Sequence, residues 1–236
     1  MRRRVIFVVI VVVCFFASVN FAESVRVGFK ATAQVTPLLF GVPLPPYAHT
    51  AVESSSTVGP SLELLLPAHI TFEASGLRKR MGYNDTIITS VGLGGPRRSV
   101  EYRDTTATLW EIPMLVKWRM RETRVSPVIG GGLALRHVGG KTHAYGVLAS
   151  SIPTVPLTPF DRMENIRELE KTWTQGLTGT VGMSVQVGFL HFSPDIRFTR
   201  WVNFAFRDPH PNIVVPVVVS KRDQIDVLMG VTFSFK

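Results

Sequence analysis

The sequence predicts an all-β protein, an eight-stranded antiparallel up-and-down transmembrane β-barrel. Three observations lead to this prediction. Apolar and polar residues alternate with a period of two in segment after segment, short and long connections alternate along the chain, and an export signal stands at the N-terminus. At 236 residues the chain is long enough for one sizeable domain, and its composition gives no sign of a second.

Alternation is clearest in the first and last segments that follow the N-terminal signal. From Val25 to Val35 every odd position is apolar, and most even positions are polar. From Ile225 to Phe235 the odd positions are again apolar, and Leu228 is the one large apolar residue among the even ones. Successive side chains of a strand point to opposite faces, so each segment predicts a strand with one apolar and one polar face.

Six further strands bring the expected total to eight. We expect them at about 59–67, 69–80, 107–120, 125–138, 174–189 and 191–202. These segments supply the roughly 9–11 residues that a tilted strand needs to cross a bilayer. Strands of soluble sheets are usually shorter, at about 5–6 residues.

The connections between these strands fall into two classes. Short turns are expected near 67–69, 121–124 and 189–191, and long loops at about 36–58, 81–106, 139–173 and 203–222. Up-and-down order places all long loops at one end of the barrel and all short turns at the other, which is the asymmetry of outer-membrane barrels. Within the third loop, the run from Asp161 to Trp173 is a candidate for a short helix that packs over the barrel mouth.

Residues 1–22 are predicted to be a cleaved signal peptide. Three arginines follow Met1, and 18 uncharged residues run from Val5 to Ala22, which makes a basic segment followed by an apolar one. Cleavage after Ala22 leaves residues 23–236 as an outer-membrane β-barrel domain. The alternative is an uncleaved anchor, because this apolar run is just long enough to span a bilayer. In either case the arginines stay in the cytoplasm and the remaining chain is exported.

The polar faces of the strands are predicted to point into the barrel and to form a polar network there. The interior of an eight-stranded barrel is just wide enough for side chains to fill it, and an unpaired ion inside would be costly. We therefore expect a closed interior with paired charges, and an ion path is the alternative. Lys79 lies on this face, and the residues assigned to the network are Glu63, Glu73, Glu111, Lys117, Arg119, Arg136, Asp195, Arg197 and Asp226.

Two tryptophans on one strand predict an aromatic belt at each membrane interface. Trp110 and Trp118 share the apolar face of the segment 107–120 and stand eight residues apart. At about 3.3 Å per residue and with strong tilt, this spacing approximates the two belts that flank the apolar band of a membrane barrel. The alternative is ordinary packing in the core of a soluble barrel.

Three stretches resemble strands of known outer-membrane barrels: Leu109–Trp118, Pro127–Ala134 and Ser193–Trp201. The first is similar to the Glu-Ile-Pro strand, and the third to the strand ending in Arg-aromatic-Thr, of the outer-membrane β-barrel domain family that includes PorT-type proteins. The likeness to small OmpA-like and OmpW-like barrels is more distant. The resemblance covers essentially the whole mature chain and implies the barrel fold, but the family has several roles.

The C-terminus resembles the signal that the barrel assembly machinery reads. Its residues are Gly230, Phe233 and Phe235, and the resemblance implies that this machinery is a partner. Two features depart from the pattern, because Leu228 stands where a polar residue is usual and Lys236 follows the aromatic residue that often ends such chains.

Composition excludes several classes of site. The single cysteine, Cys14, lies in the predicted signal, so the mature chain has no disulfide framework, thiol nucleophile or cysteine metal site. The six histidines lack metal-ligand spacing, and we expect no metal and no cofactor. The formal charge of +9 falls to +6 without the three signal arginines, because all 17 acidic residues lie downstream. This scattered charge does not favour nucleic-acid binding, whereas attraction to anionic lipid headgroups is expected.

One pattern invites an enzymatic interpretation. His191 and Ser193 share a face of one predicted strand, but they lie beside a short turn and have no third member at fixed spacing. A catalytic triad needs that third group, so we predict that the protein is not an enzyme.

Three functional hypotheses follow. The first is a non-enzymatic outer-membrane protein whose barrel carries surface loops and has a structural, adhesive or secretion-accessory role. The second is a narrow channel for small or hydrophobic solutes, opening sideways to lipid as the OmpW-like resemblance implies. The third is a soluble periplasmic lipocalin-like barrel with its apolar face inward. Outer-membrane lipids are expected partners, and the identity of any solute or envelope protein stays open.

Overall fold

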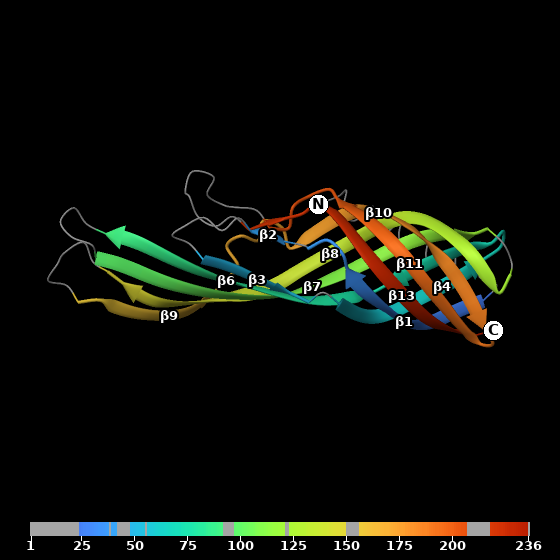
Figure 1. The fold of residues 1–236 in the computed structure, drawn as a ribbon, viewed down its shortest axis with the longest axis horizontal. Coiled ribbons are helices and arrows are strands. Elements are labelled where there is room, and N and C mark those ends of the chain that lie inside the picture. The colour runs from blue at the N-terminus through green and yellow to red at the C-terminus, as the bar shows by residue number, and fades with distance from the viewer. Residues whose placement is uncertain are drawn as a thin grey trace, which may run out of the picture.

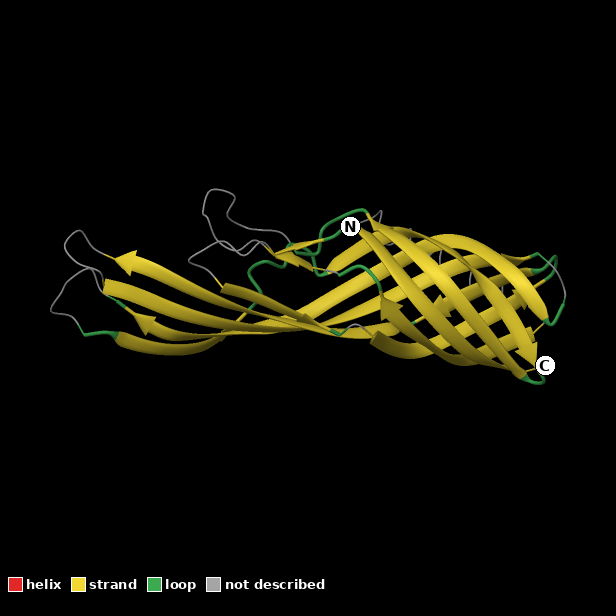
Figure 2. Cartoon of the chain, in the orientation of Figure 1, coloured by secondary structure: helices red, strands yellow, loops and turns green. Residues whose placement is uncertain are grey.

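The computed structural model describes residues 24–37, 39–41, 48–54, 56–91, 97–120, 123–149, 156–206 and 218–235. Within these ranges the regular elements are strands, and no helix there could cross a membrane (Figure 2). The predicted signal peptide lies outside the described residues. Figure 1 shows two parts, a closed barrel at one end and a long sheet that projects from it.

Eight strands form the barrel. They are β1 (Ser24–Gln34), β4 (Ser56–Leu66), β5 (Ile70–Ser75) continued by β6 (Leu77–Val91), β7 (Arg97–Arg119), β8 (Val125–Leu148), β10 (Trp173–Val187), β11 (Leu190–Trp201) and β13 (Asp223–Phe235). We count β5 and β6 as one bent strand because both pair with β7 and only Gly76 separates them.

The barrel is closed by hydrogen-bonded pairs between neighbouring strands. Each strand pairs antiparallel with the next in chain order, and β13 pairs with β1, where Val27 lies opposite Phe233. The short turns join β4 to β5, β7 to β8 and β10 to β11. In two of them the backbone takes positive φ, at Ala68 and His69 and at Gly188. The predicted eight-stranded up-and-down barrel is confirmed.

The projecting sheet corrects the prediction of long loops at 81–106 and 139–173. The outer parts of β6, β7 and β8 continue past the barrel, with β3 (Ala48–Glu53) on one edge and β9 (Thr158–Glu164) on the other (Figure 1). β7 and β8 have 23 and 24 residues, about twice what crossing a bilayer needs. The loops were wrongly predicted because both faces of this sheet carry polar residues, which removes the period-two signal.

The predicted helix from Asp161 to Trp173 is also wrong. Its first residues belong to β9, a turn region follows, and Trp173 begins β10. Residues Asp161–Glu164 instead pair with β8, which satisfies their backbone groups in the sheet. The two remaining short strands, β2 (Leu39–Gly41) and β12 (Val218–Ser220), pair with each other in a separate two-stranded sheet.

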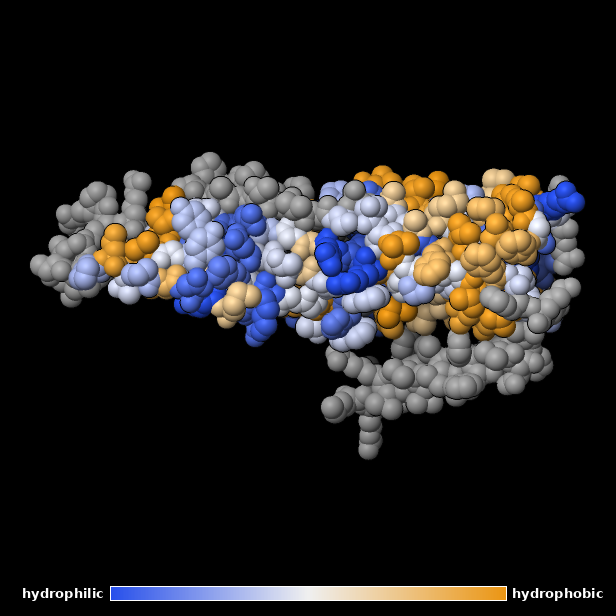
Figure 3. Space-filling view, turned by 90° about the horizontal axis from the view of Figure 1, so that it is seen from below, coloured by the Kyte–Doolittle hydropathy of each residue, from blue (hydrophilic) through white to orange (hydrophobic). Residues whose placement is uncertain are grey.

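The barrel exposes its apolar face and buries its polar face. On β1, Val27 and Phe29 are 45% and 62% exposed, whereas Lys30 is 1% exposed. Figure 3 shows hydrophobic residues gathered over the barrel and mostly hydrophilic residues over the projecting sheet. This arrangement is the reverse of a soluble lipocalin-like barrel, so the geometry does not favour that alternative.

Candidate functional site

Charged side chains fill the barrel in three layers, which we call the inner, middle and outer tiers, counted from the short-turn end. In the middle tier, Lys30 Nζ lies 2.6 Å from Glu73 Oε1 and 3.0 Å from Asp195 Oδ2. Lys117 Nζ lies 2.8 Å from Glu73 Oε2 and 2.6 Å from Asp195 Oδ2. Two lysines and two carboxylates from four strands thus form a neutral ring, and each of the four residues is less than 5% exposed.

Glycines on neighbouring strands make room for the two lysines of the middle tier. A Cβ at Gly230 would lie 3.0 Å from Cε of Lys30, and one at Gly130 would lie 2.7 Å from Cγ of Lys117. Close packing tolerates no such overlap without movement. Gly230, which the sequence assigns to the assembly signal, therefore also has a packing role inside the barrel.

The outer tier joins three cations to two carboxylates. Arg136 Nη2 donates a 3.0 Å hydrogen bond to Glu111 Oε1, and Arg197 Nη2 donates a 3.0 Å bond to Asp226 Oδ2. Lys79 Nζ lies 3.3 Å from Glu111 and 3.6 Å from Asp226, and so bridges the two pairs.

A polar and an aromatic side chain complete the outer tier. Gln224 accepts hydrogen bonds from Arg136 and from Trp201 Nε1, the latter at 3.1 Å, and donates a 2.9 Å bond to Asp226 Oδ2. The Trp201 ring covers the Arg136 guanidinium, with 3.6 Å between the guanidinium carbon and the ring centroid. A buried cation at this distance gains from the negative face of the ring.

The inner tier sets two arginines against one carboxylate. Arg26 Nη1 lies 3.7 Å from Glu63 Oε2, and Arg119 Nε has no hydrogen-bond partner among the described residues. A cavity of about 20 Å³ lies between them, and His191 and Ser193 also line it. That volume holds about one water molecule.

The pattern of His191 and Ser193 thus faces a space far smaller than the roughly 300 Å³ of a small ligand pocket. No hydrogen bond joins the two side chains within the described part of the chain. The arrangement lacks the nucleophile-to-base contact that acyl transfer requires.

An apolar cluster covers the outer tier. It includes Leu109 and Val138, each one alternation step beyond the charged residues Glu111 and Arg136 on the same strands. Ile166, from the segment after β9, packs into it, so that segment covers the barrel mouth as predicted, although without a helix. The other members are Leu39, Met81, Tyr83, Ala107, Ala205 and Phe206, and the partly buried Leu169 packs against the cluster.

A second charged cluster lies outside the barrel, in the projecting sheet. Arg103 on β7 donates to Glu164 at 2.7 Å and to Glu168 at 3.2 Å, and its Nε lies 3.3 Å from Glu101. Tyr83 donates a 2.7 Å hydrogen bond to Glu168. Burial disfavours the charged form of Arg103, but the carboxylates outweigh it and raise its pKa. The pKa of Tyr83 is raised by burial and by Glu168, so the hydroxyl stays protonated and can donate.

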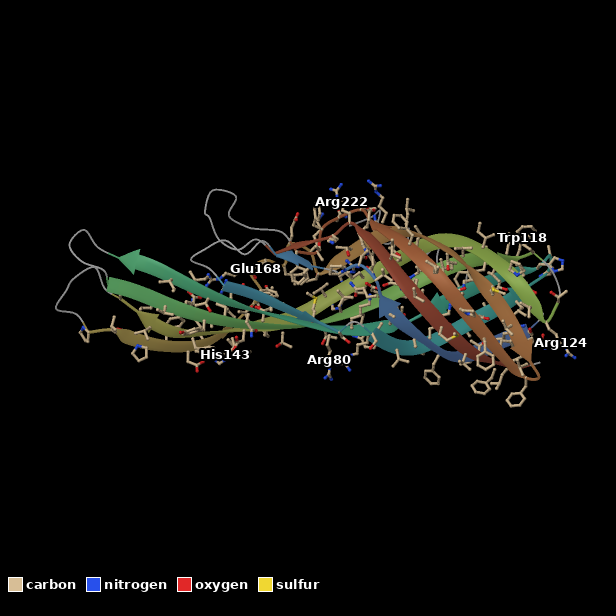
Figure 4. The ribbon with its side chains drawn as sticks, in the orientation of Figure 1. Arg80, Trp118, Arg124, His143, Glu168 and Arg222 are labelled. Atoms are coloured by element: carbon tan, nitrogen blue, oxygen red, sulfur yellow. The ribbon has the colours of Figure 1, made fainter. Side chains whose placement is uncertain are left out.

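The opposite face of the projecting sheet is polar and aromatic. Tyr102 and Tyr145 stack with 5.4 Å between ring centroids, and His143 Nε2 lies 2.8 Å from Asp161 Oδ1. In Figure 4, His143 and Glu168 come from opposite sides of the sheet, with Glu168 toward the barrel mouth. This face continues the outward side of the barrel strands with hydrophilic residues.

The strand pairing is interrupted beside Gly76, between the bent strand β5–β6 and β7, and again between β10 and β11. Between β10 and β11, pairs run to Gly182 and Asp195 and resume at Val185 and Phe192. Pro194 lies in this gap and has no N–H to donate to a neighbouring strand. The gap lies at the wall of the inner-tier cavity, which Met183 and Asp195 line.

The two predicted belt residues lie on the exterior. Trp110 and Trp118 are 41% and 49% exposed. Register places Trp110 in one row with His137 and Trp173, and the rings of these last two are 4.6 Å apart. Near the short turns, Phe189 and Phe233 make a 6.3 Å ring contact. The side chain of Phe235 lies outside the described residues.

The structure places all nine predicted network residues toward the interior, with Arg119 the most exposed of them. Sequence reasoning omitted two cations of the first strand, Arg26 and Lys30. Both occupy even positions, on the polar face of the alternating segment, so the period-two rule contained the signal. The period-two rule does not predict which of these charges form ion pairs, because partners such as Lys30 and Asp195 are 165 residues apart in the chain.

Comparison with known proteins gives distant likenesses. No protein-family model and no curated protein matches the sequence. Among solved structures, the outer membrane protein OprG from Pseudomonas aeruginosa is similar, with a TM-score of 0.47 and 11% identity over 90% of this chain and 94% of that chain. Ail, the attachment invasion locus protein of Yersinia pestis, is similar with a TM-score of 0.39 and 9% identity over 90% and 97%. Neisserial surface protein A gives 0.34 and 13% over 89% and 97%.

Proposed function

We propose that this chain is a non-enzymatic outer-membrane protein whose filled barrel anchors the projecting sheet at the cell surface, in a structural, adhesive or secretion-accessory role. The observation that carries the proposal is the inverted barrel, apolar outside and charged inside. An exterior of this kind is stable against acyl chains, where a closed barrel leaves no backbone group unpaired.

The direction of insertion follows from the two ends of the barrel. The short turns and the C-terminal end of β13 lie together, and outer-membrane barrels keep such turns on the periplasmic side. The projecting sheet then stands outside the cell. Its length and its ion pairs make it a rigid surface for contact with a partner, and the PorT-type resemblance adds secretion as the process in which that partner could take part.

Single cysteines test both placement and direction, because the predicted mature chain has no cysteine of its own. Thr106→Cys lies in the projecting sheet and Arg124→Cys in a short turn, and both positions are exposed. In intact cells, a membrane-impermeant maleimide should label Thr106→Cys only, and permeabilised cells should show label at both. Recovery of the protein in the soluble fraction, or equal labelling in intact cells, would overturn the proposal.

A narrow channel is the second candidate, and the gap at Pro194 favours it. A missing hydrogen bond in the barrel wall offers a sideways exit to lipid for a small apolar solute. Replacing Pro194 with valine should restore pairing and lower uptake of such a solute into proteoliposomes. Unchanged uptake, together with no unitary current in planar bilayers, would contradict the channel and retain the first proposal, in which the barrel anchors the projecting sheet.

A further inference from the structure

Two arginines face outward at the edge of the apolar band. Arg78 and Arg80 alternate on β6, so they share a face and stand about 7 Å apart along the strand. Both are exposed, and Figure 4 shows Arg80 pointing away from the sheet. Viewed from that side in Figure 3, strongly hydrophilic residues gather at the border between the hydrophobic barrel surface and the projecting sheet.

The strand register gives the depth of this pair. Arg78 lies opposite Trp110, which lies opposite His137, which in turn lies opposite Trp173. Exposed tryptophans of a membrane barrel sit at the headgroup level. Arg78 is therefore at that level and Arg80 one alternation step further out.

The opposite belt has no equivalent. Trp118, near the short turns, lies opposite Ile70 on one side and Ile129 on the other, and both neighbours are apolar. Within the strands that the structure describes, an outward cation thus lies opposite the belt tryptophan at the end of the barrel near Trp110, but not at the short-turn end near Trp118.

Neither arginine has an ion pair in the described part of the chain, in contrast to Arg103 and Arg200. Arg103 contacts three carboxylates, and Arg200 at another part of the rim lies 3.8 Å from Asp223. The backbone of the pair is held in place, because the Arg78 carbonyl accepts a bond from Thr57 and the Arg80 carbonyl accepts one from Ser54. Two unneutralised guanidinium groups therefore project from a fixed strand.

We propose that Arg78 and Arg80, beside Trp110, bind a phosphate group on the headgroup of an outer-leaflet lipid. A guanidinium presents a planar fork of donors that matches phosphate oxygens in pairs. The indole ring supplies the amphipathic contact at the same depth. This inference rests on the proposed outer-membrane placement and names the lipid chemistry that the barrel would select.

The test is a titration of the purified mature protein with diphosphoryl lipid A, followed by native mass spectrometry. The double variant R78Q/R80Q should bind about 25-fold more weakly, since each surface cation contributes about fivefold. The lysine variant R78K/R80K should lie between, because it keeps the charge and loses the fork. R124Q, at the opposite end, is the matched control and should bind like the parent.

Two further binding measurements identify the group that the arginines recognise. Lipid A without phosphate should bind the parent and R78Q/R80Q equally, and equimolar inorganic phosphate should leave the lipid complex in place. Equal binding of diphosphoryl lipid A by parent and double variant would overturn the inference, as would displacement by inorganic phosphate, which would assign the site to a free anion.

Insertion into phosphatidylcholine vesicles distinguishes a failure of the proposed outer-membrane placement from a failure of the lipid-binding inference. Parent and double variant should both insert and change gel mobility on boiling, as folded membrane barrels do. A parent that fails to insert contradicts the proposed function, whereas a parent that inserts but shows no phosphate preference contradicts only the lipid site.

Discussion

Three strands, β6, β7 and β8, run from the barrel into the projecting sheet, yet the outward faces of the two parts differ. On β7, Trp110, Met114 and Val116 lie on the barrel exterior, whereas Tyr102 and Thr106 lie on the same face of the projecting sheet. The backbone pairing continues without a break from one part to the other. The same pairing pattern therefore carries apolar outward residues in one part and polar outward residues in the other. The polarity of the outward face follows the surroundings of each strand segment, not its backbone pairing.

Their charged clusters differ in a second way. The middle tier of the barrel is sealed, with Glu73 at 1% exposure, whereas Glu164 in the projecting sheet has a side chain 20% exposed. Removing one partner from a sealed ion pair leaves an uncompensated charge, whereas water can reach and compensate a partly exposed one. We therefore expect mutations of similar chemistry to have unequal effects in the two parts.

The largest effect is expected for Asp195→Asn, which removes the carboxylate shared by Lys30 and Lys117. The loss should be about 3–5 kcal/mol in the free energy of unfolding, measured by urea titration in lipid vesicles. Glu164→Gln is the matched change in the projecting sheet, and it should cost less than about 1 kcal/mol, because Arg103 keeps two other carboxylates. Equal losses would mean that the barrel interior is hydrated.

Next in size is a charge placed on the outward face. Met114→Arg, midway between the two belt tryptophans, should destabilise the barrel by about 2–4 kcal/mol, because an arginine there must enter the hydrocarbon. Thr106→Arg, on the same strand and the same face, should change the free energy of unfolding by no more than about 0.5 kcal/mol. If Met114→Arg leaves the free energy of unfolding unchanged, the apolar band does not include this position, and the contrast between the outward faces of the two parts is wrong.

A methyl group tests the packing of the middle tier. Gly130→Ala should cost about 1–3 kcal/mol, because its Cβ would overlap the stem of Lys117. Gly131→Ala is the neighbouring control, since its Cβ would come no closer than 3.6 Å to any atom. Urea titration of both variants checks the difference, and similar curves would show that the lysine stem can move aside.

The smallest effect concerns pH and the projecting sheet alone. Burial opposes ionisation of Glu164, but hydrogen bonds from Arg103 and Arg167 outweigh it and lower the pKa of Glu164. A lowered folded-state pKa adds stability that is present above the unfolded pKa and is lost as pH falls through the folded one. Hydrogen exchange of β9 should therefore become faster in acid, after correction for intrinsic rates. Glu164→Gln should weaken that dependence, and an unchanged profile would point to another group.

Individual residues show how far sequence reasoning reached. Alternation assigned Val27 to the exterior and Lys117 to the interior, and it counted the eight strands of the barrel. It missed the continuation of β7 through Tyr102 and Asp104, because the projecting sheet carries polar residues on both faces and so has no apolar face to repeat. It likewise assigned His191 and Ser193 to one face but could not show the small size of the space they line.

The sequence by itself determined the number of barrel strands and the division of each into an apolar and a polar face, because a period of two is a local property of extended chain. The tertiary structure decided that the polar face points inward. The tertiary structure alone decided which charges meet, as in the ring of Lys30, Glu73, Lys117 and Asp195. It also decided how far the strands extend beyond the barrel. Both depend on register between segments far apart in the chain, and ring closure fixes that register only when all eight strands are paired.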